Sequence, residues 1–188
     1  TIVISFQATD NKDFSSSIAN FILTVGDPVV VLTGTLGTQT LNAGVPYLIK
    51  SQAIVPTGVT VTVQPGAIIK GDKATKGLLI IQPGGKLIAN GTSSQPIVFT
   101  SNQGVGERDR GDWGGIVWLG NAYVNQSARP AIEGVTPSQN YGTTGTDFTA
   151  GATEDNGSMK FVRIEYAGIE LTPNNETNSL TMGALGGA

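Results

Sequence analysis

The sequence predicts an all-β protein: a right-handed parallel β-helix of about 18 residues per coil, with a β-hairpin at its N-terminus. Three observations support this prediction. Short β-branched runs begin at Val61, Leu79, Ile97 and Ile116, at a nearly constant interval along the chain. Pro-Gly or Gly-Asn pairs punctuate the runs, and a second apolar run follows the first two Pro-Gly pairs at the same interval. A short strand that recurs at a fixed interval is typical of a solenoid, in which each coil stacks on the previous one.

Apolar and polar residues alternate within the first run, so Val63 and Thr62 lie on opposite faces of their strand. With an 18-residue coil, we expect Ile81 to stack above Val63 and Phe99 above Ile81. The predicted core is therefore a continuous apolar column. Left-handed β-helices have coils of similar length made of three hexapeptides, but the Pro-Gly corners and the link at 71–77 break that pattern and favour the right-handed form.

The chain divides into two predicted parts. Residues 1–27 contain two β-branched runs around a polar turn at 10–13, which predicts a β-hairpin and a linker. This hairpin either ends an immunoglobulin-like or cadherin-like module or caps the helix. Residues 28–188 form the predicted β-helix, interrupted at 122–158 by an irregular segment of the kind that is usually functional. Because no closing cap is evident, we expect the helix to continue beyond residue 188 or to be covered by another subunit.

The composition excludes several functions. The net charge of -3 and the pI near 4.8 provide no basic surface for nucleic acid or for an anionic membrane. No apolar run is long enough for a membrane-spanning helix, so we expect no membrane insertion. The chain contains no histidine and no cysteine, which removes the commonest general base and the commonest metal ligands.

Several segments carry a family resemblance. They are Gly-Ala-Ile-Ile-Lys-Gly-Asp at 66–72, Pro-Ile-Val-Phe-Thr-Ser at 96–101, Gly-Asp-Trp-Gly-Gly-Ile-Val at 111–117 and Phe-Val-Arg-Ile-Glu-Tyr-Ala-Gly at 161–168. The chain resembles the secreted β-helix surface proteins of Bacteroidetes, many of which are exported by the type IX secretion system. The resemblance implies a secreted protein, extracellular or at the cell surface. It implies no particular activity, because most members of that group have none assigned.

The densest charged cluster follows the third run and contains Arg108, Asp109, Arg110 and Asp112. β-Helix enzymes that cleave acidic polysaccharides use an Arg or Lys base with carboxylate-bound calcium, or clustered aspartates. These four residues are therefore the catalytic candidates if the protein is an enzyme. The simpler interpretation is a solvated turn whose charges pair with one another.

Two aromatic residues are candidates for ligand binding. Trp113, at a corner between Asp and Gly-Gly, and Tyr141, in the irregular segment, could each provide a flat surface for a sugar ring. No cofactor is required by the sequence, although calcium remains possible. Its candidate ligands are Asp72, Asp147, Glu154 and Asp155, but their spacing matches no dedicated calcium loop.

We therefore expect an extracellular structural or adhesive protein without catalytic activity, whose partner is a glycan, a surface or copies of itself. The alternative is a polysaccharide lyase or glycoside hydrolase that acts along the side wall of the helix. An enzyme needs Asp, Arg or Lys side chains that converge from adjacent coils. The outward positions carry Thr60, Thr62, Gln64 and Gln82 instead, which favours the scaffold.

Overall fold

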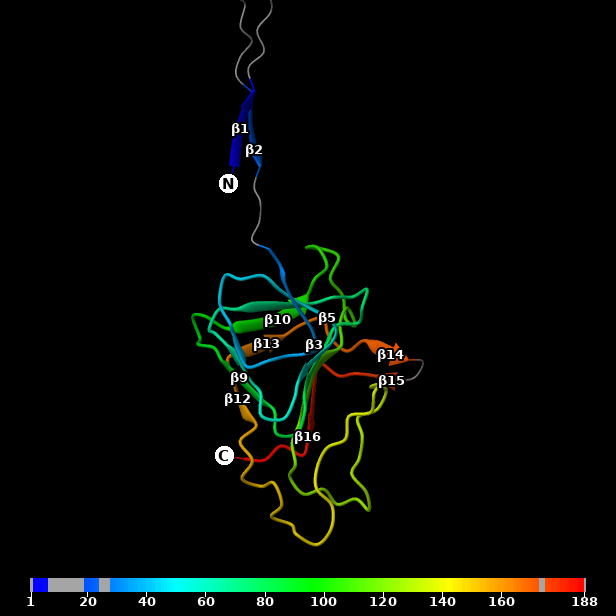
Figure 1. The fold of residues 1–188 in the computed structure, drawn as a ribbon. Coiled ribbons are helices and arrows are strands. Elements are labelled where there is room, and N and C mark those ends of the chain that lie inside the picture. Colours follow the sequence, from blue (N-terminus) through cyan, green and yellow to red (C-terminus); the bar gives the residue numbers. More distant parts are fainter. Residues whose placement is uncertain (1, 7–18, 24–27, 173–174, 188) are drawn as a thin grey trace, which may run out of the picture.

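The computed structural model describes residues 2–6, 19–23, 28–172 and 175–187. All regular elements in this part of the chain are β-strands, and the body from residue 28 onward is a right-handed parallel β-helix (Figure 1). The predicted fold class is therefore confirmed. Within the same residues, no helix is long and apolar enough to cross a membrane.

The coils of the described body have three sides, which we call the first, second and third walls. The first wall contains the first halves of β3 (Val30–Thr35) and β5 (Tyr47–Val55), then β7 (Ile68–Gly71), β10 (Ile97–Ser101) and β13 (Val162–Ile164). The second wall contains the second halves of β3 and β5, then β8 (Leu78–Ile81), β11 (Gly115–Leu119) and β16 (Leu180–Gly183). The third wall contains β4 (Gln39–Leu41), β6 (Thr60–Val63), β9 (Lys86–Asn90) and β12 (Gly157–Lys160).

One long strand makes the corner between the first and second walls. The first half of β5, at 47–49, pairs with β7, whereas its second half, at 52–55, pairs with β8. Between the halves, Ser51 has a φ of 51°, in the left-handed region that side chains seldom adopt. This single residue bends the strand, so that one continuous segment contributes to two walls.

The predicted length of the coil is wrong. Val61 pairs with Leu87, which follows it by 26 positions. The 18-residue interval links different walls instead, because Val63 lies on β6, Ile81 on β8 and Phe99 on β10. A full coil has three sides, and each side with its corner is about half as long as the 18-residue interval. Residues 18 positions apart are therefore separated by two sides of the coil and not by a full turn.

The apolar spine exists, although its register differs from the predicted one. Val55 pairs with Ile81, and Ile81 pairs with Trp118 in the next coil of the second wall. These inward residues are all buried, as are Val63 and Phe99 on the other walls. Complete burial of such side chains stabilises the fold by about 1.5–3 kcal/mol each.

Two other segments complete the described fold. β1 (Ile2–Phe6) and β2 (Ala19–Leu23) pair antiparallel, as the predicted hairpin requires, and its predicted turn at 10–13 lies outside the described residues. β14 (Glu170–Thr172) and β15 (Asn175–Glu176) form a small antiparallel pair. The segment at 120–156, which we call the arm, joins β11 to β12 and contains isolated bridges but no strand. The predicted irregular segment therefore ends before residue 157, where β12 begins.

Candidate functional site

Asp112, a catalytic candidate from the sequence, is fully buried beside the corner between the first and second walls. Its Oδ2 accepts hydrogen bonds from the Ser101 hydroxyl at 2.6 Å and from the backbone N–H of Asp109 at 3.0 Å. Its Oδ1 forms an ion pair with Nζ of Lys73 at 2.8 Å. Burial alone would raise the pKa of Asp112, but Lys73, Ser101 and the Asp109 amide outweigh burial and lower it. The carboxylate is thus ionised and ties the loop after β7 to the loop after β10.

The other three members of the charged cluster support the same loop. Nε of Arg108 donates to the carbonyl of Gln103 at 3.0 Å, and Oδ1 of Asp109 accepts from the backbone N–H of Arg110 at 2.7 Å. Arg110 itself is exposed. The structure therefore brings these residues together as a braced turn, in which Asp112 makes structural contacts. The simpler interpretation, a solvated turn whose charges pair with one another, is therefore wrong for Asp112, which is buried and forms its ion pair with Lys73, outside the cluster.

Trp113, a candidate for ligand binding from the sequence, is not exposed. Its side chain is completely buried, and its Nε1 donates to the carbonyl of Glu165 at 2.8 Å. The indole fits because residue 71, one coil away, is glycine: a Cβ there would lie 2.4 Å from Cγ of Trp113. Trp113 is consequently a core residue and offers no surface to a ligand.

Two of the calcium candidates act as turn caps. Oδ2 of Asp72 accepts from the backbone N–H and the hydroxyl of Thr75, at 3.1 and 2.7 Å. Oδ1 of Asp147 accepts from the same two groups of Thr149, at 3.0 and 2.7 Å. The hydrogen bonds from Thr149 lower the pKa of Asp147. Such local side-chain contacts are a common way to stabilise turns.

The other two calcium candidates hold the end of the arm to the helix. The carboxylate of Glu154 accepts from the backbone N–H of Gly84 at 2.7 Å and from the backbone and side-chain N–H groups of Asn121. Asp155 forms an ion pair with Lys86, which lowers its pKa. In the described part of the chain, no group of three or more acidic side chains could hold a metal ion. The four candidates are therefore not gathered into one site.

The arm covers the outside of the second wall. Ile80 and Val117 point outward from β8 and β11, yet both are completely buried, because Val135 of the arm packs over them with Ile132 and Tyr141. The alternating pattern used for the prediction missed this outer core. A signal was present, however: β8 and β11 are apolar at nearly every position, which is typical of strands buried on both faces.

A polar cleft of about 280 Å³ opens where the arm meets the last strand of the second wall. Tyr141 forms one side and is partly exposed, and its ring packs against Gly183, where a Cβ would lie only 2.9 Å away. The remaining lining residues are Ala131, Ile132, Glu133, Glu176, Thr177, Asn178 and Thr181. The cleft thus combines an aromatic ring, carboxylates, hydroxyls and an amide within one small space, which we call the Tyr141 cleft.

Residues 34–188 match the family model described as a pectate-lyase-like β-helix domain. The chain belongs to this family. The match includes nearly the whole three-sided body, and the Tyr141 cleft with it. No curated protein and no solved structure matches the chain.

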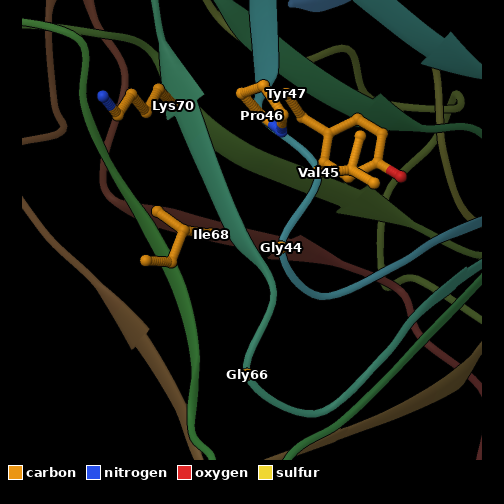
Figure 2. Close-up of a pocket in the computed structure, with 7 residues that line it drawn as sticks. All are labelled: Gly44, Val45, Pro46, Tyr47, Gly66, Ile68 and Lys70. Atoms are coloured by element: carbon orange, nitrogen blue, oxygen red, sulfur yellow. The ribbon is translucent and has the colours of Figure 1, made fainter. Parts of the chain in front are cut away.

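The pectate-lyase-like β-helix domain also has an apolar groove of about 370 Å³ on its first wall. Figure 2 shows Ile68 and Lys70 projecting from the same side of β7, alongside the turn that leads into β5. The groove is lined by Gly44, Val45, Pro46, Tyr47, Gly66, Ile68 and Lys70. The sequence pattern did not indicate this groove, although outward positions of the first wall include Leu48, Ile68 and Val98, whereas those of β6 on the third wall are threonines.

One aromatic contact on the arm was also not foreseen. The rings of Tyr123 and Phe148 meet edge to face, with centroids 4.7 Å apart, and Phe148 is 71% exposed. The arm of this pectate-lyase-like domain therefore presents aromatic surface both at the Tyr141 cleft and at this pair.

Proposed function

We propose that this domain is a non-catalytic extracellular β-helix that binds a neutral glycan in the Tyr141 cleft. The lining of the cleft is the observation that carries the proposal. A sugar ring has apolar faces that favour an aromatic surface and hydroxyls that require polar partners. Tyr141 supplies the first of these, and Glu133, Asn178 and Thr181 supply the second.

The charge of the cleft favours a neutral sugar over an acidic one. Two carboxylates, those of Glu133 and Glu176, line it, and the lining contains no basic residue. The net charge of the whole chain is -3. Polygalacturonate and alginate are polyanions, so both the cleft and the overall charge would repel them.

The second candidate function is an enzyme, which the match to a pectate-lyase-like family favours. The predicted catalytic cluster supports it poorly, because Asp112 is buried and bonded to Lys73, Ser101 and Asp109. If the domain hydrolyses a glycan, Glu133 and Glu176 are its best acid and base, since glycosidases use two carboxylates on either side of the bond.

The experiment is a titration of the domain with neutral oligosaccharides and with oligogalacturonate, followed by NMR shifts and by release of reducing ends. We expect neutral sugars to shift resonances of Glu133 and Thr181, with no release of products. Glu133→Gln and Thr181→Val should weaken binding, while Thr60→Val on the third wall should not. Binding of oligogalacturonate alone, or shifts confined to other walls, would contradict the proposal. Product release that Glu133→Gln abolishes would establish the enzyme instead.

The surface location and adhesive role rest on the resemblance to secreted Bacteroidetes proteins. Surface proteolysis of intact cells that express the natural protein would test location. We expect cleavage without lysis, whereas protection until lysis would place the protein inside the cell. Calcium is not needed for the proposed binding, because the cleft can hold a sugar through its own polar groups.

A further inference from the structure

The outer surface of the first wall carries two pairs of apolar residues. Val31 pairs with Leu48 on adjacent strands, and Ile68 pairs with Val98 on the next two, with all four side chains on the outward positions. The two pairs lie in neighbouring rows, because the partner of Leu48 on β7 is Lys70. Val31 is 47% exposed and Ile68 is 49% exposed. An apolar patch that remains exposed at the surface commonly marks an interaction site.

The second wall also carries apolar residues at outward positions, but these are covered. Its outward residues Ile80 and Val117 have no exposed surface, because the arm covers them. Among the described residues no equivalent segment covers the groove around Ile68. A bound partner would therefore bury the apolar residues of the first wall, as the arm buries those of the second wall.

A single apolar side chain projects from the loop after β10. Val105 is 94% exposed, and it lies next to Gly104 in a tight turn that the Glu107 N–H closes onto the Gly104 carbonyl at 3.1 Å. The hydrogen bond from Arg108 to the Gln103 carbonyl braces this turn from the other side. Because the loop is held in shape before any contact forms, burying Val105 would cost little conformational entropy.

The groove and the loop complement each other and lie toward opposite edges of the first wall. The groove lies at the amino ends of β5 and β7, whereas the loop leaves the carboxyl end of β10, and these strands of the first wall run parallel. The apolar part of the groove around Ile68 is therefore farther from the loop than Lys70, which pairs with Thr100 near the carboxyl end of β10. Glu107 beside Val105 and Lys70 in the groove carry opposite charges, which favours this pairing between two copies.

We propose that the loop at 104–107 of one copy docks in the first-wall groove of a second copy, with Val105 against Ile68 and Glu107 near Lys70. This partner goes beyond the proposed glycan binding and does not depend on it. Because the two contacting surfaces differ, the contact is head-to-tail, and a pair of copies keeps one free groove on one copy and one free loop on the other. Association then continues beyond two copies, as a ring or a filament.

The test is sedimentation velocity of the whole chain at concentrations up to about 1 mM, since so small a contact is expected to be weak. We expect the wild type to form a series of oligomers. Val105→Asp and Ile68→Asp should each weaken association at least about tenfold. Thr60→Asp, which adds the same charge on the third wall, should associate as the wild type does.

Mixing the two variants gives the sharpest readout. Val105→Asp keeps an intact groove and Ile68→Asp keeps an intact loop, so the mixture should form one-to-one pairs and nothing larger. Such pairs also show that both variants are folded. A wild type that stays monomeric, a variant that associates normally, or a mixture that stays monomeric would overturn the proposal. Loss of association in Thr60→Asp would do so too, because net charge would then be the cause.

Discussion

The indole of Trp113 packs directly against Gly71 of the neighbouring coil, so closely that a Cβ on residue 71 would lie 2.4 Å from Cγ of the tryptophan. Gly71 does not have a positive φ. The requirement for glycine is therefore one of space and not of backbone conformation. Through this contact, a residue at the end of β7 determines that the indole one coil later is buried.

The first prediction follows from this contact. Gly71→Ala should destabilise the domain by about 1–3 kcal/mol, because the added methyl meets a rigid buried ring that cannot move away without disturbing the core. Chemical unfolding monitored by tryptophan fluorescence measures the change. Gly37→Ala is the matched control, since a Cβ at that position meets nothing within 4 Å. Equal stability of the two variants would show that the core relaxes freely around Trp113.

The second prediction concerns the buried carboxylate. Asp112→Asn should reduce the free energy of unfolding at pH 7 by about 1–3 kcal/mol, through loss of charge-assisted hydrogen bonds and of the Lys73 ion pair. The pKa of Asp112 is lower in the folded state, so its contribution is fully present above the unfolded pKa of about 4. The contribution is then lost as the pH falls through the folded pKa.

Unfolding curves of the wild type and of Asp112→Asn between pH 7 and pH 2 therefore check the sign. We expect the stability difference to be constant from neutral pH down to about pH 4 and to shrink below that. A difference that grows in acid would mean that Asp112 is protonated in the native state. Ser101→Ala, which removes a donor to the same carboxylate, should destabilise less than Asp112→Asn does.

The third prediction separates the arm from the helix. Val135→Asp should release the arm from the second wall. The substitution removes the burial of a valine, which contributes about 1.5–3 kcal/mol, and it also places an unpaired charge in an apolar site. Proteolysis within the arm, at 120–156, should accelerate at least about tenfold as the open population rises. Ala150→Asp, at a less buried position of the arm, is the control. Unchanged cleavage would mean that the outer core does not hold the arm.

The fourth prediction concerns calcium. Millimolar calcium should leave the unfolding midpoint unchanged relative to chelator, although extracellular calcium modules bind at about 0.1–1 mM. The reason is that the oxygens of Glu154 already accept from Gly84 and Asn121, while Asp155 pairs with Lys86. A rise in the midpoint with calcium, lost in Glu154→Gln, would reveal a site that uses this carboxylate.

The parallel β-helix could be predicted from the sequence because its signals are local. Alternation in strands such as β6 identifies an inward and an outward face, and the recurring glycines mark the corners. These features depend on neighbouring residues alone. The same is true of the irregular arm, where the alternation disappears.

The register could not be predicted in this way. The predicted interval of about 18 residues and the observed interval of 26 both stack apolar residues on apolar residues. The choice between them depends on strand pairing between coils, which the local pattern does not contain. Only the tertiary structure decided that Val63 lies below Ala89 and not below Ile81. The three-sided cross-section follows from that choice.

The candidate sites changed for the same reason. The sequence by itself placed Asp112 and Trp113 in a polar corner, where exposure was reasonable, but Gly71 and Lys73 from another coil make room for the indole and pair with the carboxylate. Tyr141 was proposed as a binding residue from its type alone, and its cleft exists because the arm meets β16. Local chemistry determined the kind of fold and the kinds of residue available. Which of these side chains are buried, and which lie close together, was decided by the tertiary structure, because both depend on contacts between residues that are distant along the chain.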